Sequence, residues 1–312
     1  MLGHYIYETY RERDWTGMPE FKKLTLADRL WMEPLLRMSD FRSEEYNFNF
    51  CYIWRDIFQY QVARHGDFLL LKSCRRTPTY LYPPGSGDVK AAIDILIEDA
   101  RQKDHPFLFH TVLAEQKALL EVLYPGGFQF MELGDYFDYV YDAQSLITLA
   151  GKKLHSKRNH IHRFEENNPG WSYEGIAPEN MPEVIAMSEE WCRLNDCKGD
   201  KNMRDEACAV HNALQDYFSL GMDGGLIRAD GRVVAFSMGE RLNSDTYLVH
   251  IEKAFGEIQG AYAIINREFA ARNCQDFLYI NREDDSGEEG LRKAKLSYRP
   301  VFLVEKYAAK LL

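Results

Sequence analysis

The stretch GGLIRADGRVVAFSMGERLNSDTYLVHIE, residues Gly224–Glu252, decides the fold of the second half of this chain. Its segments Gly224–Ala229, Val233–Arg241 and Thr246–Glu252 are typical of three successive strands. Asp230-Gly231 joins the first two segments as a strong two-residue hairpin turn. The pattern therefore predicts a three-stranded antiparallel meander.

Helices and strands flank this meander in an informative order. A strand and two helices precede it, and a helix, a strand, a helix and a strand follow it. The preceding elements are Trp171–Ile176, Glu179–Leu194 and Glu206–Leu220, and the following ones are Gly260–Asn273, Phe277–Asn281, Glu288–Tyr298 and Val301–Glu305. This order is similar to that of the GCN5-related N-acetyltransferase (GNAT) fold.

The first half of the chain alternates helices and strands as well. The amphipathic helix Asp88–Arg101 and the strand Phe107–Val112 are its clearest elements. We predict an α/β fold with two mixed sheets, built from two tandem GNAT-like domains. Residues 1–145 form the N-terminal domain, residues 146–169 a connecting basic helix (Ser145–Glu166), and residues 170–312 the C-terminal domain.

Composition excludes several classes of protein. The 312 residues carry 38 Lys+Arg and 48 Asp+Glu, a net charge of −10, which argues against a dedicated binder of duplex DNA. The longest stretch without a charged residue, Thr77–Gly87, is too short to span a membrane. Residues 1–15 show no secretory signal, and the six scattered cysteines are typical of free thiols in a reducing cytoplasm. We therefore expect a cytoplasmic protein.

A basic segment stands out against the acidic total. Residues 143–164 contain no Asp or Glu, and five cations lie among them: Lys152, Lys153, Lys157, Arg158 and Arg163. Such a cluster would attract the phosphates of coenzyme A, tRNA or lipid head groups. The alternative is a solvated face of an interdomain helix, and charge alone does not decide between them.

A polar loop follows the predicted strand Phe277–Asn281. Asn281, Glu283, Asp284 and Asp285 crowd the end of that strand, a place where α/β proteins commonly bind ligands. A carboxylate held there could act as general base for an amine or hydroxyl nucleophile. Asp284, Asp285 and Glu288 could bind a metal ion, but their spacing fits no EF-hand loop, and we predict no metal.

Two glycines precede the predicted helix Gly260–Asn273. Gly256 and Gly260 could present backbone N–H groups to a donor phosphate, as the coenzyme loop of GNAT enzymes does. Glu257 and Tyr262 depart from the GNAT pattern, which has a basic or amide residue and a small residue there. This departure argues against ordinary use of acetyl-CoA.

Two long motifs give a more specific resemblance. The segments DYFDYVYDAQSLITLAGKKLHSKRNHIHRF (135–164) and NREDDSGEEGLRKAKLSYRPVFLVEKY (281–307), together with NFNFCYIWR (47–55), resemble the family named for the C-terminal domain of phosphatidylglycerol lysyltransferase. Members of that family resemble tandem GNAT domains and Fem-type aminoacyltransferases, which move an aminoacyl group from aminoacyl-tRNA to an amine or hydroxyl without a covalent enzyme intermediate. Motif positions here are occupied by Lys152, Lys153, Lys157, Arg158, Asn281, Glu283, Asp284, Gly290, Lys293 and Tyr298.

These observations together predict an acyltransferase. Glu283, Asp284 and Asn281 are the candidate catalytic residues. The five cations with Gly256 and Gly260 would bind the donor phosphates, and Lys293, Tyr298 and Arg299 would contact substrate. The co-substrate is aminoacyl-tRNA or, alternatively, an acyl-CoA.

The acceptor is unknown. The lipid-modifying relatives carry an N-terminal membrane region that this sequence does not show, so we expect a soluble acceptor or one at a peripheral membrane contact. A non-catalytic protein that binds anionic ligands stays open as a third possibility. We expect His250 to be a packed or surface residue rather than a catalyst.

Overall fold

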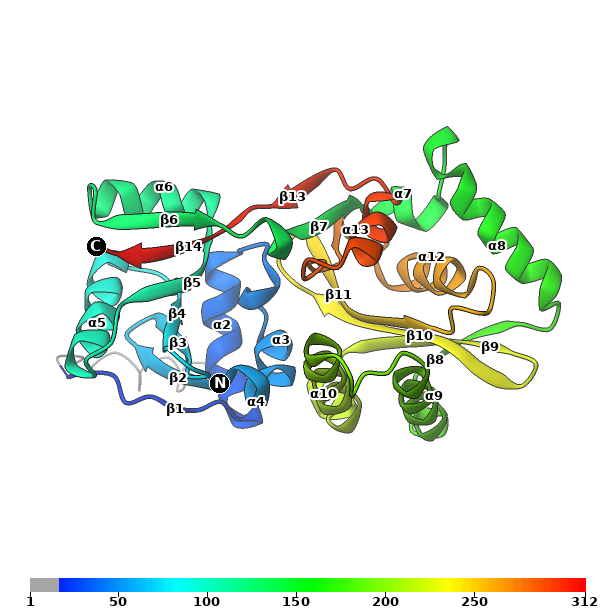
Figure 1. Ribbon diagram of the computed structural model, residues 1–312, viewed down its shortest axis with the longest axis horizontal. Coiled ribbons are helices and arrows are strands. Elements are labelled where there is room, and N and C mark those ends of the chain that lie inside the picture. The colour runs from blue at the N-terminus through cyan, green and yellow to red at the C-terminus, as the bar shows by residue number, and fades with distance from the viewer. Residues whose placement is uncertain (1–16) are drawn as a thin grey trace, which may run out of the picture.

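The computed structural model describes residues 17–312, and it contains two seven-stranded mixed sheets that lie side by side (Figure 1). In order across the first sheet the strands are β1 (Lys22–Lys23), β2 (Tyr60–His65), β3 (Phe68–Ser73), β4 (Thr79–Leu81), β5 (Leu108–Leu113), β14 (Lys306–Leu311) and β6 (Phe128–Glu132). Across the second they are β8 (Ser172–Gly175), β9 (Asp223–Ala229), β10 (Arg232–Arg241), β11 (Thr246–Ala254), β12 (Tyr279–Asn281), β7 (Asp138–Asp142) and β13 (Phe302–Val304). The prediction of two mixed sheets is confirmed.

Helices accompany the strands in both halves. The first half carries α2 (Arg29–Ser39), α3 (Phe48–Ile53), α4 (Arg55–Phe58), α5 (Val89–Gln102) and α6 (Ala114–Leu123). The second carries α7 (Ala143–Thr148), α8 (His155–Asn167), α9 (Met181–Leu194), α10 (Lys201–Gln215), α11 (Tyr217–Leu220), α12 (Ala261–Asn273) and α13 (Glu289–Leu296). Short 3-10 turns lie at Leu26–Asp28, Glu44–Tyr46, Gly134–Tyr136 and Lys152–Leu154.

The GNAT-like order predicted for the second half is present. The meander β9–β10–β11 pairs antiparallel, α12 crosses over, and β12 then pairs parallel to β11. The first half repeats this arrangement with β2–β3–β4, α5 and a parallel β5. The two sheets therefore have equivalent strand orders, as expected for tandem copies of one unit.

The sheets do not divide the chain at residues 145 and 170. Strand β7 comes before the expected linker yet joins the second sheet, between β12 and β13. Strand β14 is the last strand of the chain yet joins the first sheet, between β5 and β6. Each half thus contributes one strand to the other, and the segment from β13 to β14 runs across both (Figure 1).

The connecting segment is also not one continuous helix. Helix α7 ends at Thr148, and the next residue, Leu149, has a left-handed backbone (φ 50°) and caps the helix through its N–H to the carbonyl of Ser145 at 2.9 Å. Gly151, also at positive φ (83°), starts the turn into α8. The segment nevertheless has an apolar face, because Leu154, Ile161 and Phe164 are buried.

The cysteine prediction needs a correction. Cys192 and Cys197 are five residues apart and form a disulfide at the end of α9, because the turn after that helix brings the two side chains together. The other four, Cys51, Cys74, Cys208 and Cys274, are free. The N-terminal segment considered for a secretory signal, residues 1–15, lies outside the described residues. Within residues 17–312, no helix is long and apolar enough to cross a bilayer.

Candidate active site

Strands β11 and β12 pair only over a short length. Thr246–Leu248 matches Tyr279–Asn281, after which β12 ends while β11 continues to Ala254. The register between β10 and β11 shifts at the same level, because Met238 faces Ile251 and Gly239 faces Val249, which leaves His250 as an extra residue. Such a bulge bends a strand and ends regular pairing. The side chains beyond it form the site.

A cluster of polar and aromatic side chains lies beyond the end of β12; we call it the Arg282 cluster, and its members are Arg282, Glu252, Asn266, Tyr298 and Lys157. Arg282 Nη2 donates to Glu252 Oε1 at 2.8 Å, and both side chains are about nine-tenths buried. Asn266 Nδ2, from α12, donates to the other oxygen of Glu252 at 3.0 Å. The guanidinium of Arg282 lies 5.0 Å from the ring centre of Tyr298.

This cluster has unused hydrogen-bonding capacity. Among residues 17–312, Arg282 Nη1 and Asn266 Oδ1 are buried and have no hydrogen-bond partner. A buried donor or acceptor without a partner costs about 1–3 kcal/mol, so such groups are usually satisfied. One unpaired donor and one unpaired acceptor on the same network match a ligand with a carbonyl and an amine or hydroxyl.

Lys157 enters the same cluster from α8. Its Nζ lies 3.9 Å from the ring centre of Tyr298. Burial lowers the pKa of the Lys157 amine to about 8; repulsion from Arg282 adds to that decrease, and Glu252 opposes it. Lys157 therefore lies apart from the exposed cations with which the sequence grouped it.

Glu283 belongs to a neighbouring charged triad. His250 Nδ1 lies 2.9 Å from Glu283 Oε1, and its Nε2 lies 3.1 Å from Glu240 Oε1. Burial alone would lower the pKa of His250, but the hydrogen bonds to Glu240 and Glu283 raise it to about 9. At neutral pH the imidazole is therefore a cation between two carboxylates. The bulge residue His250 is a charged partner of Glu283, which the strand pattern did not indicate.

The other residues of this loop fix its shape. Asn281 is fully buried; its Nδ2 donates to Asp138 Oδ2 at 2.8 Å and to the carbonyl of Arg42 at 2.9 Å, and its Oδ1 accepts from the N–H of Glu283. Asp284 Oδ1 accepts from the N–H and hydroxyl of Ser286 at 2.8 and 2.9 Å. Asn281 is thus held in the interior, whereas Asp284 is bound by Ser286 in an exposed turn.

Two further side chains, Lys295 and Asp285, stabilise the loop through hydrogen bonds. Lys295, from α13, donates to the carbonyls of Arg282, Glu283 and Asp284. Asp285, considered above as a metal ligand, accepts from Tyr139 at 2.6 Å and from Arg292 Nε at 2.8 Å. In the described part of the chain, no group of three His, Cys, Asp or Glu side chains is placed to hold a metal ion.

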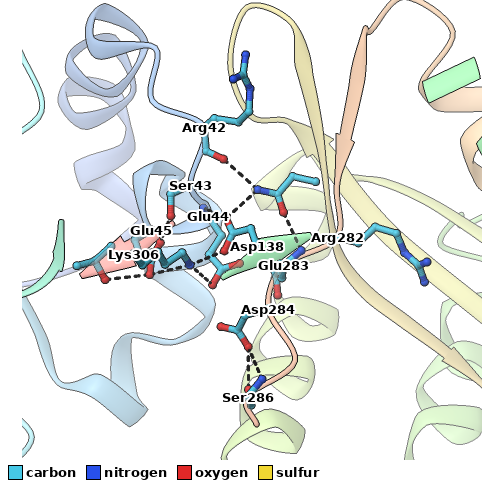
Figure 2. Close-up of polar contacts among 12 residues, drawn as sticks. Arg42, Ser43, Glu44, Glu45, Asp138, Arg282, Glu283, Asp284, Ser286 and Lys306 are labelled. Atoms are coloured by element: carbon cyan, nitrogen blue, oxygen red, sulfur yellow. Dashed lines mark hydrogen bonds and ion pairs between the residues drawn. The ribbon is translucent and has the colours of Figure 1, made fainter. Parts of the chain in front are cut away.

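A second buried cluster lies beside the loop, between the two sheets (Figure 2). Lys306, from β14, has its ammonium 3.0 Å from Glu44 Oε1 and 3.1 Å from Glu45 Oε1, and it also pairs with Asp138 of β7. Burial and the nearby Asp138 carboxylate raise the pKa of Glu44 well above its usual value. Figure 2 shows Arg282 directed away from these four residues, which we call the Lys306 cluster.

The predicted phosphate-binding residues are separated. Lys152, Lys153 and Arg163 are exposed and form no ion pair with any residue of 17–312. Arg158 instead donates to the carbonyls of Leu149 and Gly151, where it stabilises the end of α7.

The two glycines of the predicted phosphate loop also differ from each other. Gly256 faces open space. Gly260 (φ 85°) packs against α8 so closely that a Cβ atom would lie 2.2 Å from the carbonyl oxygen of His160.

The predicted substrate-binding residues are likewise not together. Tyr298 is buried in the Arg282 cluster, whereas Lys293 is exposed and pairs with Glu289 at 2.6 Å. Arg299 is exposed with a left-handed backbone (φ 62°). Arg282, Glu252 and Asn266 are not among the predicted site residues, although alternation along an extended segment turns the Arg282 side chain away from those of Asn281 and Glu283.

A separate cavity of about 160 Å³ lies between α9 and α10. Ile185, Trp191, Val210, the Cys192–Cys197 disulfide and Lys253 are among the residues that line it. Lys253 follows Glu252 on β11, so this cavity opens on the opposite face of the strand from the Arg282 cluster. The candidate site is therefore the Arg282 cluster, which has unpaired polar groups, and not this cavity.

Comparisons with known proteins agree with this architecture. The family model described as phosphatidylglycerol lysyltransferase, C-terminal, matches residues 37–310. A solved structure of a conserved protein of unknown function from Bacteroides thetaiotaomicron VPI-5482 is 42% identical, with a TM-score of 0.91 over 95% of this chain and 100% of that one. The structure of L-PGS from Bacillus licheniformis is 18% identical, with a TM-score of 0.64 over 91% of this chain and 92% of that one, which shows a shared fold.

A curated relative gives a shorter match. An uncharacterized protein from Mycoplasmoides gallisepticum (strain R(low / passage 15 / clone 2)) is 24% identical over 188 residues, 56% of this chain. The match spans 56% of the length of that relative.

Proposed function

The chain belongs to the phosphatidylglycerol lysyltransferase C-terminal family, and family and fold point to an acyltransferase; we propose that it transfers an aminoacyl group from aminoacyl-tRNA to an amine or hydroxyl acceptor. Transfer would take place at the Arg282 cluster. Because charged tRNA is a cytoplasmic molecule, the proposal places the reaction on the cytoplasmic side.

The observation that carries the choice of donor is the packing of α8 on the start of α12. GNAT enzymes seat the coenzyme pyrophosphate at this helix start, where backbone N–H groups must be free. Here α8 lies directly against Gly260, and the first N–H of α12, that of Ala261, already donates to the carbonyl of Ile258 at 3.1 Å. The side of the helix start that α8 covers is therefore closed to a coenzyme phosphate, which supports tRNA over acetyl-CoA.

The exposed cations provide a different track for phosphates. Lys152, Lys153 and Arg163 extend along the outer surface of α8 and the turn before it, and they are not neutralised by carboxylates of the described residues. A polynucleotide spreads its charges over many ångströms, so it can follow such a track.

The Arg282 cluster supplies groups suited to acyl transfer. The unpaired Nη1 of Arg282 can donate to the acyl carbonyl oxygen and stabilise the negative charge that develops on it. The unpaired Oδ1 of Asn266 can accept a hydrogen bond from the attacking amine or hydroxyl and so orient it. Glu252 holds both side chains in place through its two oxygens. Asn281 acts as a positioning residue for the loop.

Calorimetry on one preparation tests the donor. We expect measurable binding of tRNA and weak or no binding of acetyl-CoA. Replacing Lys152, Lys153 and Arg163 by Glu should weaken tRNA binding and lower the salt slope by about 0.7–0.9 log units per lost phosphate contact. The matched control replaces the exposed cations Lys23, Arg76 and Lys310 by Glu. Micromolar binding of acetyl-CoA without binding of tRNA would reverse the assignment.

A further inference from the structure

Lys157 lies on the inner face of α8. The buried residues of that helix and of the turn before it are Leu154, Ile161 and Phe164, and Lys157 follows Leu154 by three positions and precedes Ile161 by four. These spacings put all four on one helical face. The helix therefore directs this amine toward the protein interior.

Lys157 lies near an aromatic ring and a cation, and no carboxylate of the described residues is paired with its amine. Its Nζ faces the ring of Tyr298, and the guanidinium of Arg282 lies over the same ring. Glu252 is the carboxylate beyond them, and it is already bound by Arg282 and Asn266. Lys157 forms no ion pair with any residue of 17–312, and its charged form has the ring face of Tyr298 as its direct contact.

We propose that Lys157 is the proton acceptor of the transfer reaction, taking a proton from the acceptor nucleophile and returning it to the leaving group. The inference rests on the proposed function. Its basis is that the amine and the guanidinium of Arg282 both lie over the ring of Tyr298, and that the amine has no carboxylate partner among residues 17–312.

The reaction balances in two steps. The acceptor nitrogen or oxygen attacks the acyl carbon, its proton passes to Lys157 Nζ, and the carbonyl oxygen becomes an anion held by Arg282. The new bond to the acyl carbon is then retained while the ester bond to the tRNA ribose breaks. The proton on Lys157 passes to the departing ribose oxygen, which leaves Lys157 neutral as it began.

The carboxylates of the loop are less suited to this role. Glu283 is bound by the His250 imidazole and Asp284 by Ser286. Lys157, in contrast, has a pKa lowered to about 8, so roughly a quarter of the molecules hold a neutral amine at pH 7.5. A general base transfers protons most effectively when its pKa lies near the pH of the reaction.

Two substitutions test whether Lys157 acts as a base or only as a positive charge. Lys157→Met removes the amine at similar length, and Lys157→Arg keeps a cation that cannot lose its proton. Single-turnover rates with aminoacyl-tRNA should fall about 10²–10⁴-fold in both variants. The wild-type rate should rise with pH through about 8, and this rise should be absent in Lys157→Arg, while the affinity for tRNA changes by less than about 2-fold.

A matched control comes from the first half. Lys117 of α6 lies 4.4 Å from the ring centre of Tyr307, a similar lysine–tyrosine contact far from the site. Lys117→Met should leave rate and pH profile unchanged. Thermal melts of all variants verify that they are folded.

The outcomes distinguish the two proposals. Transfer by the wild type with a normal rate and pH profile in Lys157→Arg would overturn the role of Lys157 and leave the proposed function intact. No transfer by the wild type from any charged tRNA would overturn both.

Discussion

Removal of the Lys306 ammonium should destabilise both halves of the protein at once. Lys306 is fully buried on β14, and its partners Glu44, Glu45 and Asp138 come from the first half and from β7 of the second sheet. Burial opposes the charge of Lys306, but Asp138 and the glutamates hold its pKa well above the ordinary value. Lys306→Met would leave buried carboxylates without a cation.

The magnitude follows from the charge left behind. Breaking a buried ion pair from one side costs about 3–5 kcal/mol. At about 2 °C per kcal/mol for a protein of this size, the melting temperature should fall by about 6–10 °C at pH 7.5. The loss should become smaller as the pH falls, because burial raises the pKa values of Glu44 and Asp138, and a protonated carboxyl leaves no unpaired charge.

Calorimetric unfolding measures this loss of stability, and two further variants serve as controls. Lys310→Met changes the exposed lysine of the same strand and should stay within about 0.5 kcal/mol of wild type. Adding Asp138→Asn to Lys306→Met should recover part of the loss, because it removes one unpaired charge. A loss below 1 kcal/mol, or a shift confined to one of two separate transitions, would refute the reasoning.

Two further outcomes are expected. Gly260→Ala should cost about 2–4 kcal/mol, because its positive φ and the carbonyl of His160 leave no room for a Cβ atom, whereas Gly256→Ala should be nearly neutral; equal melting temperatures for both would contradict this. His250 contributes stability that is fully present below pH 6.5 and is lost as the pH rises through about 9, since its folded pKa is the higher one. Urea unfolding between pH 7 and 10 should therefore show a loss of about 2.5 kcal/mol in wild type that His250→Gln lacks.

The meander and the polar loop were predictable because local signals determine them. Asp230-Gly231 forces a tight turn, and apolar runs on both sides define strands that the structure places at Asp223–Ala229 and Arg232–Arg241. The location of the candidate site at the end of β12 followed from the general position of ligand sites in α/β sheets.

The rest depends on contacts between distant segments. Nothing in KYAAKL (306–311) indicates that it pairs with β5 and β6, because the choice of partner strands is a tertiary property. The role of His250 depends on a bulge, and bulges leave no clear mark in the sequence. Lys157 is different, since its spacing from Leu154 and Ile161 already placed it on the buried face, but its charge suggested the exposed one.

The exchange of strands has a consequence for synthesis on the ribosome. Strands β5 and β6 flank the place that β14 fills, so the first sheet keeps two unpaired strand edges until residues 306–311 have been made. At 5–20 residues per second, this interval lasts roughly 10–35 s after β6 emerges. Unpaired edges of that kind are sites of wrong association. The first sheet is therefore completed only after the second half has been translated.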